Sequence, residues 1–148
     1  MYKKIILSFI GLIACLTSYG QCNIDSLKDI ALARMPKEFV FSKSYKLQAP
    51  TNGRLRQMEY TCVMTKGTTY CLGMTSADGE ARNLVVKLFD KERNELATNY
   101  SVSSSQNQQF GKQLIFNCQA TGIYYLSFSF KGSQRNCGFG VLGFKIVK

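Results

Sequence analysis

Apolar residues change their spacing twice along the chain. Residues 5–16 are almost entirely apolar, residues 24–34 repeat apolar side chains at helical spacing, and from Phe39 onward apolar and polar residues alternate. Asn23 can cap the start of the helix, and Pro36 ends it. Because alternation is the period of a half-buried strand, the pattern predicts one short helix followed by a β-rich domain.

Eight strands are predicted, joined by short or polar connections that often contain glycine. Their expected ranges are 39–48, 57–65, 69–75, 83–89, 95–100, 110–118, 123–131 and 137–147. Eight short alternating strands favour an all-β, antiparallel, jelly-roll-like sandwich with one short N-terminal helix. The alternation assigns these side chains to the core: Met58, Tyr60, Cys62, Met64, Tyr70, Leu72, Met74, Leu84, Val86, Leu88, Leu114, Phe116, Cys118, Tyr124, Leu126, Phe128 and Phe130.

The last strand contains three glycines, Gly138, Gly140 and Gly143. Glycine inside a strand marks a bulge or a close approach of another backbone or ligand. A bent edge strand is the preferred interpretation, and contact with another chain or a ligand is the alternative.

The N-terminus resembles a bacterial export signal, because two lysines precede the apolar run. Cleavage after Gly20 gives a signal peptide over 1–20 and a single domain over 21–148. The alternative is a lipobox that ends at Cys15, whose acylation would anchor the protein to a membrane. The apolar run is shorter than the ~20 residues of a membrane span. A secreted, periplasmic or cell-surface location follows, with membrane attachment only through Cys15.

The chain is basic, with 19 Lys and Arg against nine Asp and Glu and a net charge of +10. The positive residues are scattered and form no run, which argues against a nucleic-acid partner. A diffuse positive field attracts acidic polymers, so an acidic envelope polysaccharide is one expected partner and an envelope protein is the other.

Histidine is absent. This excludes imidazole bases and histidine-ligated metal sites, so only carboxylate, lysine or tyrosine chemistry remains. A glycosidase needs two facing carboxylates about 5–10 Å apart, and no such pair is apparent. Calcium could bind at Asp78 and Glu80, or at Asp90, Glu92 and Glu95, although ordinary charged turns explain both groups. We therefore expect no enzyme activity, no metal and no cofactor.

Tryptophan is also absent, so tyrosines are the available stacking surfaces for a glycan. The alternation places several tyrosines and polar amides outward or in loops. The candidate ligand-binding residues are Tyr45, Asn99, Tyr100, Gln106, Asn107 and Tyr125.

Five cysteines follow the predicted signal, which leaves one unpaired in a monomer. A two-residue turn at Lys66-Gly67 would place Cys62 opposite Cys71 in a hairpin. The hydrophobic pattern instead favours a three-residue turn with Gly67 left-handed, which puts Cys62 inside and Cys71 outside. Cys118 with Cys137 is the alternative bridge.

Cys22, close to the predicted mature terminus, is the expected free or intermolecular thiol. Metal binding by the cysteines is not expected, because their spacings match no compact zinc motif.

Val86, Leu88 and Asp90 form a V-x-L-x-D pattern, and residues 122–128 form a later G-x-Y-x-L pattern. In these two segments the chain resembles the bacterial pre-peptidase C-terminal (PPC) family of secreted β-sandwiches. The resemblance covers roughly 45 residues and rests on structural positions. It implies an accessory or binding sandwich of the kind attached to secreted enzymes, and it transfers no functional residue.

The sequence therefore predicts a secreted or envelope-associated, non-catalytic binding module for a protein partner or an acidic glycan. The alternative is a structural subunit of a cell-envelope assembly, as a lipoprotein if Cys15 is acylated. A histidine-free glycosidase that uses two carboxylates is the third hypothesis.

Overall fold

The structure is a computed structural model that describes residues 22–48, 57–102, 108–132 and 137–146. Within these ranges, one helix, α2 (Ile24–Ala33), precedes ten strands. The strands are β1 (Val40–Gln48), β2 (Gln57–Met64), β3 (Thr68–Ser76), β4 (Leu84–Phe89), β5 (Glu95–Thr98), β6 (Tyr100–Val102), β7 (Gln108–Phe110), β8 (Gln113–Asn117), β9 (Gly122–Phe130) and β10 (Cys137–Ile146). The expected signal peptide and Cys15 lie outside the described residues.

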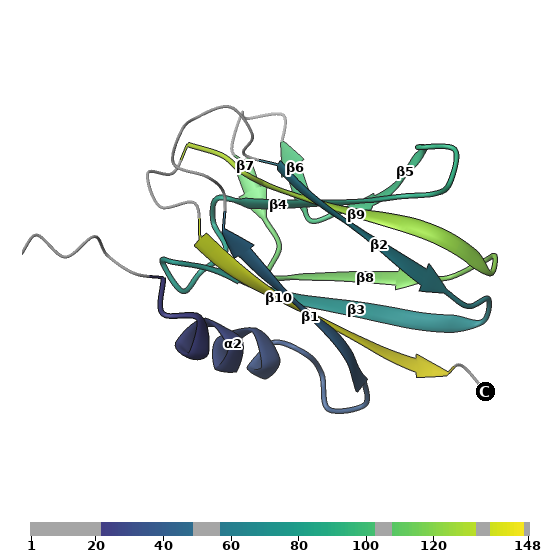
Figure 1. Cartoon of the computed structure of the whole chain (residues 1–148), viewed down its shortest axis with the longest axis horizontal. Helices are drawn as coiled ribbons and strands as arrows, with labels where there is room; N and C mark the ends of the chain where they lie inside the picture. Colours follow the sequence, from purple (N-terminus) through teal and green to yellow (C-terminus); the bar gives the residue numbers. More distant parts are fainter. Residues whose placement is uncertain (1–21, 49–56, 103–107, 133–136, 147–148) are drawn as a thin grey trace, which may run out of the picture.

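Eight of these strands form two four-stranded antiparallel sheets. Sheet A has the order β1-β10-β3-β8, and sheet B has the order β2-β9-β4-β5. Strands β6 and β7 form a separate two-stranded ribbon. Figure 1 shows the two sheets as layers, with α2 outside the layer that contains β1, β10 and β3. The all-β sandwich with one short helix is confirmed.

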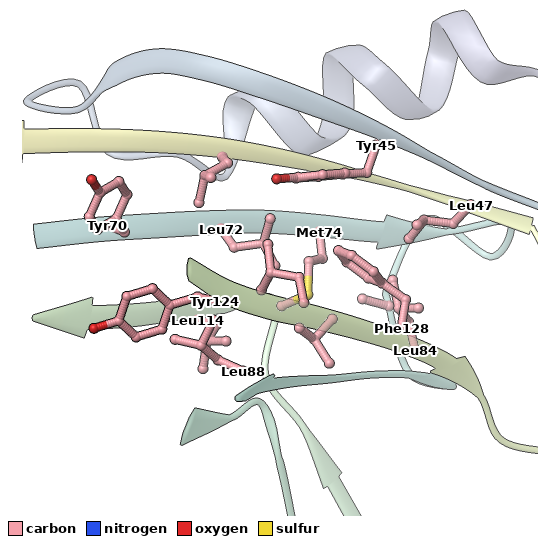
Figure 2. Packing of buried hydrophobic residues seen from close by; sticks show 14 of the residues in the cluster. Tyr45, Leu47, Tyr70, Leu72, Met74, Leu84, Leu88, Leu114, Tyr124 and Phe128 are labelled. Carbon is pink, nitrogen blue, oxygen red and sulfur yellow. The ribbon is translucent and has the colours of Figure 1, made fainter. Parts of the chain in front are cut away.

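The core between the sheets follows the predicted alternation. Every side chain that the sequence assigned to the core lies in the main hydrophobic cluster or packs against it. Figure 2 shows Tyr45, Leu72 and Met74 from sheet A facing Leu88 and Phe128 from sheet B. Burying large apolar side chains from both inner faces is the main force that holds the two sheets together.

Strand β10 lies inside sheet A, so the expected bent edge strand is wrong. Helix α2 covers its outer face, where Leu27 and Ala31 pack against Phe139 and Val141. The glycines in this part of sheet A let the helix approach. A Cβ on Gly73 of β3 would lie 2.6 Å from the carbonyl oxygen of Ala31, which no side chain could tolerate.

Polar contacts fix both ends of α2. The Asn23 side chain accepts a hydrogen bond from the amide of Ser26 at 3.3 Å, which confirms the predicted N-cap. At the other end, the Arg34 guanidinium donates to the carbonyls of Met74 and Gly79. A disulfide between Cys22 and Cys137 ties the chain before the helix to the first residue of β10.

The Cys22–Cys137 disulfide corrects the expected cysteine pairing, because Cys62, Cys71 and Cys118 are free thiols. The hairpin that would align Cys62 with Cys71 does not form, since β2 belongs to sheet B and β3 to sheet A. Gly67 is left-handed as predicted, with φ +78°, but its turn crosses from one sheet to the other.

The alternative bridge between Cys118 and Cys137 is also wrong. Cys118 follows β8, whose last residue Asn117 pairs with Thr69 at the beginning of β3. Cys137 begins β10, whose next residue Gly138 pairs with Ser76 at the end of β3. The two cysteines therefore lie at opposite ends of sheet A, and Cys22 is bonded within the chain rather than free.

Candidate functional site

A groove opens along the edge of the sandwich where β1 of sheet A and β2 of sheet B lie next to each other. Its volume is about 490 Å³, a size typical of ligand sites. Strands β1 and β2 supply the walls, and β3 and β10 supply the floor. The polar rim consists of Ser42, Lys43, Thr61, Thr65 and Thr68.

The floor of the groove is apolar because it continues the inner face of sheet A. Leu142 and Phe144 alternate along β10, and Tyr70 lies beside Phe144 on β3 with ring centres 6.5 Å apart. Ile146 extends this face to the end of β10. The groove is therefore a part of the core that is left open to solvent between the two sheets.

Tyr45 of β1 supplies a polar atom to this floor. Its side chain is 1% exposed, and its ring packs against Tyr60 and Phe128 with centre separations of 4.9 and 5.5 Å. Its hydroxyl is buried and has no hydrogen-bond partner among the described residues. Burial strongly raises the pKa of this phenol, so the hydroxyl is neutral and keeps its proton.

The Tyr45 hydroxyl points into the groove. Figure 2 shows it directed toward the end of the core where Tyr70 lies, and both tyrosines line the groove. The Tyr70 hydroxyl accepts a hydrogen bond from the amide of Thr65 at 3.0 Å, whereas that of Tyr45 has no equivalent. Leaving a buried polar group unpaired costs about 1–3 kcal/mol. Buried polar atoms without a partner are rare, so this one requires an explanation.

Two further groups accompany Tyr45 in the groove. The Lys43 ammonium lies 5.6 Å from the centre of the Tyr45 ring, and no described carboxylate forms a salt bridge with it. Cys62 of β2 is a half-buried thiol whose Sγ lies 3.7 Å from the carbonyl oxygen of Tyr124. Burial raises its pKa to about 11, although the nearby Lys43 charge opposes that shift. At neutral pH the groove therefore holds a cation, a neutral hydroxyl and a neutral thiol.

The groove is flanked by two strand edges that no other described strand covers. Strands β1 and β2 are each the last strand of their sheet on this side. The two edges are linked where the Tyr60 hydroxyl donates to the carbonyl of Lys46 at 2.9 Å. Backbone groups of β1 are thus accessible to a donor from outside sheet A.

Exposed apolar side chains gather around the same end of the sandwich. Val63 and Ile146 line the groove and are 71% and 72% exposed. Val40 and Phe41, which are also exposed, begin β1 and pair with Phe144 and Gly143 of β10. Figure 1 shows the start of β1 and the ends of β2 and β10 at one end of the molecule. A cluster of this kind marks an interaction surface more often than single scattered residues do.

The candidate ligand-binding residues predicted from sequence do not form one site. Tyr45 was expected to face outward, but it alternates with Leu47 on the inner face of sheet A and is buried. Tyr125 lies on the outer face of sheet B, beneath the Arg93 guanidinium at 3.7 Å. Tyr100 lies on β6, beneath the Lys131 ammonium at 3.7 Å. Gln106 and Asn107 lie outside the described residues.

Asn99 was also expected in the ligand-binding set, but it is buried. Its Oδ1 accepts from the amide of Val86 at 2.7 Å, and its Nδ2 donates to the carbonyls of Leu84 and Gly111, each at 2.9 Å. These bonds join β4 to the segment that leads into β8, so every polar atom of the side chain serves the fold.

The acidic residues form ordinary charged contacts. The glutamates Glu38, Glu59, Glu80, Glu92 and Glu95 form salt bridges with lysine or arginine. Asp78 and Asp90 accept hydrogen bonds within their own turns. Within the described ranges, no group of three or more His, Cys, Asp and Glu side chains could hold a metal. No described helix is long and apolar enough to cross a membrane.

The sequence named Tyr45 as a ligand-binding candidate but did not indicate that it is buried, and it did not indicate that Lys43 and Val63 line a groove. The available signal was Tyr45 itself, because it shares a face with Leu47. The exposed Phe41 and a break in register between Phe41 and Lys43 hide that alternation. The groove itself depends on which strands end each sheet, and short-range patterns do not contain that information.

Comparisons with known proteins give a likeness at the level of structure. No protein-family model matches the chain, and no curated protein matches it. Among solved structures, the chain is similar to Aeromonas hydrophila PliG, a periplasmic lysozyme inhibitor of g-type lysozyme. The sequence identity is 15%, the match covers 70% of this chain and 82% of that chain, and the TM-score is 0.38.

Proposed function

We propose that the protein is an exported, non-catalytic β-sandwich that binds a protein partner at the edge formed by β1 and β2. The observation that supports this most is the unpartnered, buried hydroxyl of Tyr45 at the floor of an open groove. Val63 and Ile146 add exposed apolar surface at the rim. A partner that covers this edge would remove apolar surface from water and satisfy the hydroxyl together.

The edge strands favour a protein as the occupant. Free strand edges present unpaired backbone groups, and protein segments recognise such edges by adding a strand. Lys43 is the only charged side chain among the described residues that line the groove. The centre of a protein interface typically combines few charged residues with exposed apolar side chains.

Export is supported by the apolar run behind two lysines and by the Cys22–Cys137 disulfide. Disulfides persist mainly in oxidising compartments such as the periplasm and the exterior. A binding role without catalysis is supported by the chemistry of the groove, because no carboxylate within the described ranges lines it and the sequence contains no histidine.

Site-specific photo-crosslinking tests this function. A photoreactive residue replaces Val63 at the groove, and in a matched control it replaces Ile115, which is 54% exposed on β8. We expect irradiation of intact cells to join one protein to the Val63 position and to leave the Ile115 position without it. A partner that crosslinks at Ile115 and not at Val63 would contradict the proposal. Attachment of polysaccharide alone at Val63 would favour the glycan reading instead.

A further inference from the structure

We infer that the groove receives the C-terminal residue of the partner protein, with its apolar side chain on the floor and its carboxylate between Lys43 and Tyr45. This inference rests on the proposed function, since it names the part of the partner that the groove recognises. The recognised ligand would combine an apolar side chain with a carboxylate, both at the end of an extended polypeptide.

The floor supplies the apolar half of this recognition. Leu142, Phe144 and Ile146 form a continuous apolar row along β10, and Val63 lies at the rim on the β2 side. An aliphatic or aromatic side chain that lies on this row loses its contact with water. The rim hydroxyls of Ser42, Thr61 and Thr65 are exposed to solvent, so they impose no matching requirement on the buried part of the ligand.

Lys43 and Tyr45 supply the anionic half. The Tyr45 hydroxyl is buried, neutral and without an acceptor, so it requires one. The Lys43 ammonium lies 5.6 Å from the centre of the Tyr45 ring, on the same groove, and no carboxylate of a described residue lines that groove. A carboxylate has two oxygens, so one group can accept from the hydroxyl and from the ammonium together. The missing partner is therefore an anionic acceptor.

The strand edges indicate that this carboxylate ends a polypeptide. Strands β1 and β2 flank the groove with edges that no described strand covers. The carbonyl of Lys46 accepts a hydrogen bond from Tyr60, which shows that an outward carbonyl of β1 can accept a donor from outside sheet A, although this one is already used. An extended segment can pair with the edge while its terminal residue enters the groove, and C-terminal carboxylate capture is a known mode of peptide recognition. A free fatty acid would use the floor and leave the edges unpaired.

Short N-acetylated peptides that end in Leu, Phe or Val test the inference, each with either a free carboxylate or a carboxamide. Affinity is measured by fluorescence anisotropy with the exported, disulfide-bonded protein, and occupancy is measured as protection of Cys62 from alkylation. We expect at least one carboxylate peptide to bind about tenfold or more tightly than its carboxamide, because only the carboxylate attracts Lys43. The tighter peptide should also protect Cys62.

Variants separate recognition from folding. Lys43→Met should bring the affinity ratio between carboxylate and carboxamide close to one, whereas Lys46→Met should leave the ratio unchanged. Both lysines are exposed on β1, but only Lys43 lines the groove. Tyr45→Phe should weaken binding of the carboxylate peptide several-fold while its thermal unfolding stays that of the parent.

Three results would overturn the inference: equal affinity for both peptide forms, no binding by any of the peptides, or Cys62 protection by decanoate and by none of the peptides. Any of these together with a protein crosslink at Val63 would leave the proposed function in place. Carboxylate-selective peptide binding without a protein crosslink at Val63 would have the opposite meaning, since it would confirm the chemistry of the groove and reject a protein partner in the cell.

Discussion

The two edges of the sandwich each contain a buried polar side chain, but only one of the two side chains has all its hydrogen-bond partners. At the β5/β8 edge, Asn99 uses its whole amide to bond Val86, Leu84 and Gly111. At the β1/β2 edge, the Tyr45 hydroxyl has no partner in the described structure. The first edge is closed by its own polar network, whereas the second is left open as a groove with an unsatisfied donor.

This difference separates a polar residue that stabilises the fold from one that is available for binding. Both residues are buried, so burial alone does not distinguish them. What distinguishes them is whether the chain supplies the matching hydrogen-bond groups. A fold rarely retains an unmatched buried donor, and a binding site is one of the few settings that can justify its cost.

The largest effect on stability is expected from removing the Cys22–Cys137 disulfide. This disulfide lies at neither of the two edges. Replacing both Cys22 and Cys137 with serine should lower the free energy of unfolding by about 2–5 kcal/mol, because the bond closes a long loop of the unfolded chain. Urea denaturation measures the loss. The alkylation rate of Cys62 in the native state should stay the same, since α2 lies on the outer face of sheet A. A change in that rate would show that the helix and the groove are coupled.

Asn99→Ala tests the closed edge. We expect a loss of about 3 kcal/mol in the free energy of unfolding, because the substitution leaves the Val86 amide and two carbonyls without their side-chain partner. Urea denaturation at constant pH checks this value. A loss below about 0.5 kcal/mol, the usual range for surface substitutions, would mean that the network does not close the edge.

Tyr45→Phe tests the open edge. The substitution removes an unpaired buried hydroxyl and keeps the ring contacts with Tyr60 and Phe128. We expect the free energy of unfolding to stay the same or to rise by up to about 1 kcal/mol. The same denaturation experiment measures it, with Asn99→Ala as the opposite case. Destabilisation by more than about 1 kcal/mol would show that the hydroxyl has a partner within the folded chain.

The smallest effect concerns the pH at which the groove thiol reacts. Burial raises the pKa of Cys62 to about 11, so the folded protein favours the neutral thiol. The stability that this provides is complete below pH 9, the ordinary pKa of the group, and is lost as the pH rises through 11. Alkylation should therefore accelerate about tenfold per pH unit between pH 8 and pH 10. An alkylation rate that levels off near pH 9 would contradict the burial of the thiol. The Cys62→Ala variant is the control, because it shows which part of the alkylation comes from Cys62.

Much of the fold could be predicted from the sequence because it depends on short-range alternation. Leu72, Leu88 and Leu126 each lie on the inward face of an alternating strand, and this alternation predicted the correct core. The sheet partners could not be predicted in this way. Residues 57–76 resemble a hairpin, yet their two strands belong to different sheets.

The site depended on those long-range partners. Tyr45 is buried because β1 pairs with β10, a strand almost one hundred residues later, and the groove exists because β1 and β2 each end a sheet. Asn99 is buried where backbone groups 12 to 15 residues away match its amide. The position of helix α2 against sheet A could not be predicted either, although the glycines that allow its close approach are present in the sequence.

Solvent access to the groove in living cells tests the central claim most directly. Val63→Cys at the groove and Ile115→Cys on β8 place exposed thiols at the two positions, in a Cys62→Ala background. Their alkylation rates are measured in intact cells and with the purified protein. A binding groove predicts that the thiol at position 63 reacts markedly more slowly in cells than after purification, while the thiol at position 115 reacts at the same rate in both. Equal rates at position 63 would contradict the account.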